Sequence, residues 1–100
     1  MAKGYWIALV DVKNPDAYKN YATGLQPVLK KHGGRYVARA GKTEMVEGKV
    51  KPRVVVIEFP SYDAAMTCYR DPDYKALIPI RRANAESELI VTEGYDGAQP

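Results

Sequence analysis

The first apolar segment of the chain, residues 5–12, carries apolar side chains at both odd and even positions until Asp11. It is rich in β-branched and aromatic residues, which favour strands. A strand that is apolar on both sides is buried on both faces. We therefore expect residues 5–12 to form a strand inside a sheet that is covered on each face.

A helical repeat of apolar residues follows this strand. Asn14 is suited to cap a helix, and Pro15 is suited to its first position. Apolar side chains then recur at helical spacing up to the stop at Gly33-Gly34, and they are Tyr18, Tyr21, Ala22, Leu25, Val28 and Leu29. We expect Gly24 and Pro27 to bend or break this helix near its middle.

Residues 35–40 and 53–59 predict two further strands, joined by a charged connection that begins at Gly41. We expect the strands to pair antiparallel, with Arg35 facing Glu58 and Val37 facing Val56. One face of the pair is then wholly apolar, formed by Tyr36, Ala38, Val55 and Ile57. The other face carries the charged side chains of Arg35, Arg39 and Glu58.

The last third of the chain predicts helical segments and a fourth strand. Ser61 caps a short helix over residues 62–70. Asp71 and Pro72 start a second helical segment, whose apolar stripe runs to Ala85 with a kink at Pro79. Residues 88–95 have the composition of a strand.

This order of elements predicts an α+β fold of the ferredoxin-like, split βαβ (βαββαβ) type with a four-stranded antiparallel sheet. One domain spans residues 1–96, and residues 97–100 form a flexible tail. Helices in this arrangement cover one face of the sheet only. Because the first strand is apolar on both sides, the second face needs the sheet of another copy, which predicts a homodimer.

An ordered set of short motifs runs along the chain. It includes Gly4-Tyr5-Trp6, Gly33-Gly34-Arg35-Tyr36, the segment from Val55 to Tyr62, the segment from Cys68 to Tyr74, and Glu93-Gly94-Tyr95. With this set, the chain resembles the domain of unknown function 1330 family over nearly its whole length. The resemblance implies a dimeric α/β barrel, in which two ferredoxin-like sheets pack face to face. It implies no activity, since the family has no established one.

Composition and charge limit the kinds of partner that we expect this protein to bind. The net charge is +3, and the basic residues gather between Lys30 and Arg53 without stacking aromatics or a nucleic-acid-binding motif, so we expect no nucleic acid. No apolar stretch is long enough for a signal peptide or a membrane span. Cys68, the single cysteine, excludes an intramolecular disulfide. These features predict a cytoplasmic protein without a membrane partner.

Metal and cofactor chemistry have little support in the sequence. His32, the only histidine, is placed to interact with the dipole at a helix C-terminus. Cys68 is expected to be a small core residue, because no base or electropositive pattern accompanies it. Without a cluster of His or Cys residues we expect no metal site and no cofactor.

The charged face and the tyrosines supply the candidate site. Glu58 is the candidate acid or base, and Arg35 or Arg39 the candidate anion holder. Tyr18, Tyr69 and Arg81 are further candidates for ligand binding. The alternative is structural: Arg35 and Glu58 form a cross-strand ion pair at the dimer interface.

Two classes of function follow from these residues. In the first, each protomer binds a small organic molecule between sheet and helices, and the site carries out cofactor-free proton transfer or isomerisation. In the second, the protein is a non-enzymatic dimer that binds a metabolite or a protein partner. The sequence does not decide between an enzyme and a binding protein.

Overall fold

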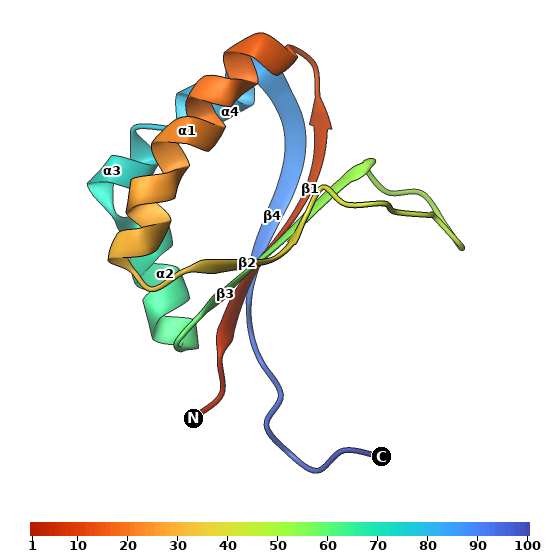
Figure 1. The fold of residues 1–100 in the computed structure, drawn as a ribbon, viewed down its shortest axis with the longest axis vertical. Helices are drawn as coiled ribbons and strands as arrows, with labels where there is room; N and C mark the ends of the chain where they lie inside the picture. The colour runs from red at the N-terminus through yellow and green to blue at the C-terminus, as the bar shows by residue number, and fades with distance from the viewer.

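The structure is a computed structural model that describes residues 1–100. Its elements follow the order β1 (Gly4–Val12), α1 (Pro15–Lys31), β2 (Arg35–Arg39), β3 (Arg53–Phe59), α2 (Tyr62–Arg70), α3 (Pro72–Lys75), α4 (Ile78–Asn84) and β4 (Ala85–Glu93). Figure 1 shows the helices on one side of a twisted sheet, with both chain ends at the same end of the molecule. No helix is both long enough and apolar enough to cross a membrane.

The four strands form one antiparallel sheet in the order β2-β3-β1-β4. Trp6 of β1 lies opposite Ile57 of β3 on one side and Val91 of β4 on the other. This order is the ferredoxin-like arrangement, so the predicted fold class is confirmed. The bounds of β3 agree with the prediction, whereas β4 begins earlier than expected, at Ala85.

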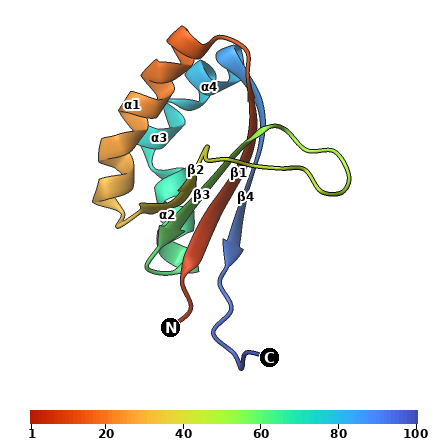
Figure 2. The same ribbon diagram turned by 45° about the vertical axis from the view of Figure 1, so that its right-hand side comes forward.

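The two faces of the sheet differ in what covers them. The even-numbered side chains of β1, among them Trp6 and Val10, point toward the helices and are buried. Tyr5, Ile7 and Leu9 alternate with them and point to the other face. All the helices lie on the first side in both views (Figures 1 and 2). The second side is called the outer face below.

Helix α1 is continuous, so the predicted break near Gly24 and Pro27 is wrong. A Cβ atom at Gly24 would lie 2.7 Å from Cδ2 of Leu77, which shows how closely α1 approaches the segment between α3 and α4. The buried side chains of α1, including Leu25, Val28 and Leu29, hold the helix against the sheet on both sides of Pro27. Packing therefore outweighs the local helix-breaking tendency.

The segment predicted as one kinked helix is two helices followed by a strand. Pro79 lies in the first turn of α4 rather than inside a longer helix. Asn84 ends α4: its Nδ2 donates to the Ile80 carbonyl at 2.8 Å, and its own carbonyl accepts the N–H groups of Lys13 and Asn14. Ala85 then pairs with Val12 as the first residue of β4.

An aromatic core joins the helices to the sheet. Trp6 is 2% exposed, and its Nε1 donates a hydrogen bond to the Ala65 carbonyl at 2.9 Å. The rings of Tyr74 and Phe59 lie 4.9 and 5.3 Å from the Trp6 ring, centroid to centroid. This cluster joins α2 and α3 to the helix-facing side of β1 and β3.

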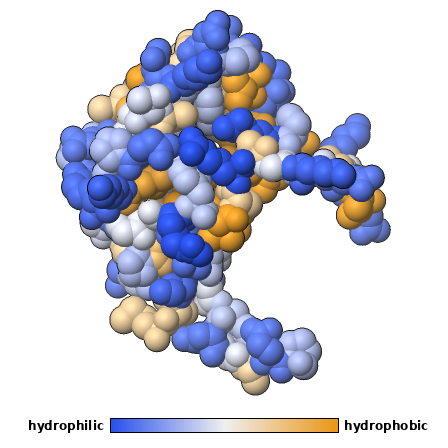
Figure 3. Space-filling view, viewed as in Figure 1, coloured by the Kyte–Doolittle hydropathy of each residue, from blue (hydrophilic) through white to orange (hydrophobic).

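The outer face carries no helix. It exposes apolar side chains, including Ile90, which is 56% exposed, and Val37. Residues 40–52, called the arm below, project from the sheet on the side away from the helices (Figure 2). Figure 3 shows apolar side chains at the tip of the arm and along the sheet between the arm and the C-terminal tail.

Candidate functional site

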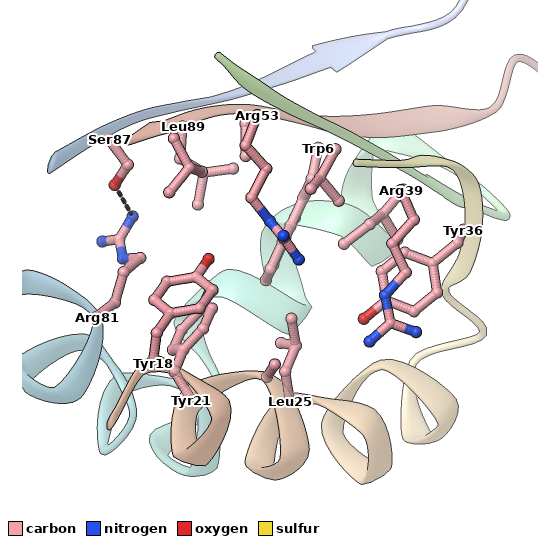
Figure 4. A pocket seen from close by; sticks show the side chains of 15 residues that line it. Trp6, Tyr18, Tyr21, Leu25, Tyr36, Arg39, Arg53, Arg81, Ser87 and Leu89 are labelled. Carbon is pink, nitrogen blue, oxygen red and sulfur yellow. Dashed lines mark hydrogen bonds between the residues drawn. The ribbon is translucent and has the colours of Figure 1, made fainter. Parts of the chain in front are cut away.

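A cavity lies between the helix-facing side of the sheet and helices α1 and α4 (Figure 4). The space open to the centre of a water molecule is about 40 Å³. Its walls are mostly apolar, and the residues that line it are Trp6, Ala8, Val10, Tyr18, Tyr21, Ala22, Leu25, Tyr36, Arg39, Arg53, Val55, Ile57, Arg81, Ser87 and Leu89. A space of this size accommodates about three water molecules or a small organic group.

Two alanines help to explain why this part of the core is hollow. Ala8 of β1 lies opposite Val55 and Leu89 at the centre of the sheet, and Ala22 lies across the cavity on α1. Larger side chains at these positions would fill the gap between the layers. The small side chains of Ala8 on the helix-facing side of β1 and of Ala22 on the sheet-facing side of α1 thus leave space for the cavity.

Arg81 is the most deeply buried charged side chain of the site. It is 8% exposed, and its Nη1 donates to Oγ of Ser87 at 3.2 Å, as the dashed line in Figure 4 marks. Its Nε is buried without a hydrogen-bond partner. The predicted candidate Arg81 therefore lines the cavity, with donors that the protein leaves unused.

Arg53 and Tyr18 complete the polar part of the cavity. Arg53 extends from the start of β3, and its Nε is also buried without a partner. Its guanidinium carbon lies 5.8 Å from the centre of the Tyr18 ring. Figure 4 shows the Tyr18 hydroxyl pointing into the cavity between Arg53 and Arg81. Burial raises the pKa of Tyr18, and the positive charges of Arg53 and Arg81 oppose that rise.

Because of a β-bulge in β2, Arg39 lies on the opposite face of the sheet from the one predicted. Arg35 pairs with Glu58 as expected, but Ala38, not Val37, lies opposite Val56, and Arg39 lies opposite Val55. The extra residue in β2 turns Arg39 to the helix-facing side, where its guanidinium carbon lies 4.3 Å from the Tyr36 ring centre. Arg39 consequently borders the cavity instead of sharing a face with Glu58.

Arg35 and Glu58 lie on the outer face. Nε of Arg35 is 3.3 Å from Oε1 of Glu58, which confirms the predicted ion pair. Oη of Tyr5 donates to Oε2 of the same carboxylate at 3.0 Å, and this bond raises the pKa of Tyr5. The expectation that these charges border the cavity is wrong, because the sheet separates the two faces.

The candidate Tyr69 does not line the cavity. Its ring packs against those of Trp6 and Tyr74, with centroid distances of 6.2 and 5.4 Å. It belongs to the aromatic core on the other side of Trp6. Close to the cavity, the hydroxyls of Tyr21 and Tyr74 share a buried hydrogen bond of 2.9 Å, and burial strongly raises the pKa of Tyr21.

Four polar residues that line the cavity were not predicted as site residues from the sequence: Tyr21, Tyr36, Arg53 and Ser87. The signal for Arg53 was present, because it shares the odd-numbered parity of Val55 and Ile57 in the apolar, helix-facing row of β3. Ser87 lies on the helix-facing side because it pairs with Val10, and this pairing is known only from the register of β4.

The remaining chemically reactive side chains lie outside the cavity. Nε2 of His32 is 2.7 Å from Oδ2 of Asp71, beyond the end of α1. Cys68 is buried in the core, and burial raises the pKa of its thiol to about 12. No three His, Cys, Asp or Glu side chains lie together in an arrangement that would hold a metal ion.

Comparison with protein families finds one match. The model of a family described as a domain of unknown function (DUF1330) covers residues 3–95. No curated protein matches the chain.

Solved structures share the fold. A protein of unknown function from Rhodopseudomonas palustris is 24% identical, with a TM-score of 0.77, 96% of this chain covered and 85% of that chain. SnoaB, a cofactor-independent oxygenase from Streptomyces nogalater, is 14% identical, with a TM-score of 0.68 and coverage of 100% and 97%. A dimeric ferredoxin-like protein of unknown function from Thermobifida fusca is 17% identical, with a TM-score of 0.63 and coverage of 92% and 91%.

Proposed function

The chain belongs to the DUF1330 family, and from this premise we propose that it is a homodimer in which each protomer binds a small organic molecule in the cavity between sheet and helices. The observation that carries the proposal is the cavity itself. Its apolar walls and few inward polar groups are the usual composition of a small-molecule site. Tyr18, Arg39 and Arg81 are the sequence candidates that lie there, and Arg53 joins them.

The homodimer is supported by the outer face. Ile7, Val56 and Ile90 form an apolar strip across three strands that no helix of this chain covers. A second sheet is a suitable cover for such a strip. The structural neighbour from Thermobifida fusca is described as dimeric. In this arrangement the ion pair between Arg35 and Glu58 lies at the interface and has a structural role.

Binding without catalysis is the function that the cavity favours. No carboxylate or imidazole lines it, so it lacks the side chains that most often act as general bases near neutral pH. Glu58, the sequence candidate for an acid or base, lies across the sheet.

Cofactor-free proton transfer is the second candidate, and Tyr18 is the observation that favours it. The Tyr18 hydroxyl points into the cavity and can donate a hydrogen bond to a bound anion, which would stabilise negative charge formed when a proton leaves the substrate. The arginines beside it would stabilise negative charge that develops on a substrate. SnoaB, described as a cofactor-independent oxygenase, has this fold, but 14% identity supports the fold alone.

The binding function is tested by filling the cavity. Ala22→Leu places a larger side chain in the space, while Thr23→Leu adds the same side chain at an exposed position of the same helix. Ligand-observed NMR with a mixture of small neutral and ionised organic molecules should detect binding to the wild type and to Thr23→Leu, and not to Ala22→Leu. Binding that Ala22→Leu leaves unchanged would place the ligand elsewhere, and the absence of binding to wild type would contradict the proposal.

A further inference from the structure

We propose that the ligand of the cavity is a small monocarboxylate, held by the guanidinium groups of Arg53 and Arg81, with its apolar part directed toward Leu25 and Tyr36. This inference rests on the proposed small-molecule site and states the chemical class that the site selects.

Arg81 is the first observation behind the carboxylate. A guanidinium has five N–H donors, and the structure gives Arg81 one side-chain hydrogen bond, to Ser87. Its Nε is buried and has no hydrogen-bond partner, and only 8% of the residue is exposed to water. None of the ion pairs of the chain includes Arg81. A buried positive charge without a protein counter-charge is destabilising, so its presence points to an anion supplied from outside the chain.

Arg53 is the second and independent observation. It comes from β3, on the opposite wall from α4, and its Nε is likewise buried without a partner. Figure 4 shows Arg53 reaching into the middle of the cavity, with the Tyr18 hydroxyl between it and Arg81. Two cations and a phenol from three elements thus converge on one space. The two positive charges repel each other in the free protein, and a negative group between them would attract both.

The shape and polarity of the cavity select the kind of anion. A planar carboxylate matches the fork of a guanidinium and accepts two parallel hydrogen bonds from it. The space of about 40 Å³ leaves room for a carboxylate and a few carbon atoms, but not for a nucleotide or a sugar phosphate. A phosphate dianion would also lose more hydration than a monoanion on entering walls that are mostly apolar.

The other end of the cavity suits an apolar group. Leu25 and Tyr36 line it there, with Arg39 stacked on the Tyr36 ring at the exposed edge. Figure 4 shows Tyr18 and Arg53 between Arg81 and Tyr36. A carboxylate bound at Arg53 and Arg81 therefore points its carbon chain along the cavity toward Tyr36.

Matched pairs of probes test the charge requirement. Butyrate and propionate are compared with butyramide and propionamide, which have nearly the same shape and no charge, and with inorganic phosphate. Isothermal titration calorimetry at low salt should show that each carboxylate binds about tenfold to hundredfold more tightly than its amide, the range expected for charge-assisted hydrogen bonds. Inorganic phosphate should bind more weakly than butyrate.

Variants assign the preference to the buried arginine. Arg81→Met keeps the length of the side chain and removes its charge, and it should abolish the carboxylate preference without lowering the melting temperature. Arg82→Met removes the neighbouring, exposed arginine of the same helix and should keep the preference. Arg81→Lys retains the charge without the planar fork, so it should bind carboxylates more weakly than wild type. It takes the place of Arg81→Met as the test variant if Arg81→Met does not fold.

Four results would overturn the inference. Equal affinity for carboxylates and amides would show a ligand site without charge selection. A preference for carboxylates that survives in Arg81→Met would show that Arg81 is not the group that selects the charge. Either result leaves the proposed small-molecule function standing. Tighter binding of phosphate than of butyrate would replace the carboxylate by another anion. Failure of both carboxylates and amides to bind the wild type would contradict the inference and the proposed function together.

Discussion

Buried polar side chains in this protein fall into two groups. Those of the aromatic core have partners within the chain: Trp6 donates to the Ala65 carbonyl, and the Tyr21 and Tyr74 hydroxyls bond to each other. The two arginines are only partly satisfied: Arg81 donates to Ser87, but Arg53 and Arg81 each leave a buried Nε without a partner. Unsatisfied buried donors are rare in folded proteins, and the two found here belong to residues that line the same cavity, which supports the proposed ligand site.

The tyrosine pair offers a test at this scale. Tyr74→Phe leaves the Tyr21 hydroxyl buried without its partner and should lower the free energy of unfolding by about 1 to 2 kcal/mol. In the double variant Tyr21→Phe, Tyr74→Phe both polar groups are removed, and the cost should be less than the sum of the two single changes. Urea denaturation measures all three, with the exposed Tyr62→Phe as control. Additive costs would show that the hydrogen bond contributes nothing.

At the scale of elements, close approaches and one bulge decide how the strands and helices meet. The bulge in β2 places Arg39 on the cavity side, and the missing side chain at Gly24 lets α1 lie against Leu77. At the other end of the sheet, β1 begins beside the connection between β3 and α2. A Cβ atom on Gly4 would lie 2.3 Å from the carbonyl oxygen of Ser61. Backbone contacts of this kind fix the geometry between elements.

Gly4→Ala tests that contact. The added methyl group meets backbone atoms that cannot rotate away, so the variant should lose about 2 to 3 kcal/mol of stability. Gly41→Ala, in the arm, is the matched control, because a Cβ atom there has no neighbour within 4 Å. Thermal and urea denaturation should separate the two variants clearly. Equal stability would mean that β1 and the Ser61 segment shift apart at little cost.

Asp71 joins the end of α1 to the junction of α2 and α3. Its Oδ2 lies 2.6 Å from Nζ of Lys31 and 2.7 Å from Nε2 of His32, and its Oδ1 accepts the Asp73 N–H. The hydrogen bond from Lys31, then that from His32, holds the pKa of Asp71 well below its usual range. A carboxyl with a lowered pKa stabilises the fold above its unfolded pKa, and this contribution is lost as the pH falls through the folded value.

Asp71→Asn should therefore melt at a lower temperature than wild type at pH 7, and the gap should narrow as the pH falls below about 4, the ordinary pKa of Asp. Melting curves from neutral to acidic pH measure the gap. Asp63→Asn, an exposed change in the first turn of α2, should show no comparable pH-dependent gap. A constant gap for Asp71→Asn across the whole range would exclude the ionised carboxylate as its cause.

At the scale of the whole molecule, the two faces of the sheet carry different groups. The helix-facing side holds the core and the cavity, and its polar groups are aimed inward. The outer face combines exposed apolar side chains such as Ile90 with the Arg35–Glu58 pair, and the arm projects beyond it. This division supports dimerisation through one face and ligand binding behind the other.

Ile90→Lys tests dimerisation. The side chain is 56% exposed in the single chain, so the change should leave the protomer folded while placing a charge in the proposed interface. Sedimentation velocity at micromolar concentration should show a dimer for wild type and for Thr23→Lys, an exposed change on α1, and an 11.1 kDa species for Ile90→Lys. A monomeric wild type, or a dimer that survives Ile90→Lys, would exclude the outer face as the interface.

Local patterns along the chain were enough to predict the strands, most of the helices and their order. The bounds of β3 and the Ser61 and Asp71 caps depend on neighbours a few residues apart, and the structure agrees with each of them. The ion pair of Arg35 with Glu58 also followed from pairing alternating strands in the register that buries their apolar sides.

The cavity and the charges that line it depend on how distant segments pack. The bulge that turns Arg39 inward and the continuity of α1 through Pro27 depend on contacts between segments far apart in the chain. The convergence of Arg53 and Arg81 joins a strand and a helix separated by two other helices. Local periodicity sets the direction of a side chain within its own element, but the packing of elements sets which side chains meet, and the site of this protein arises from that packing.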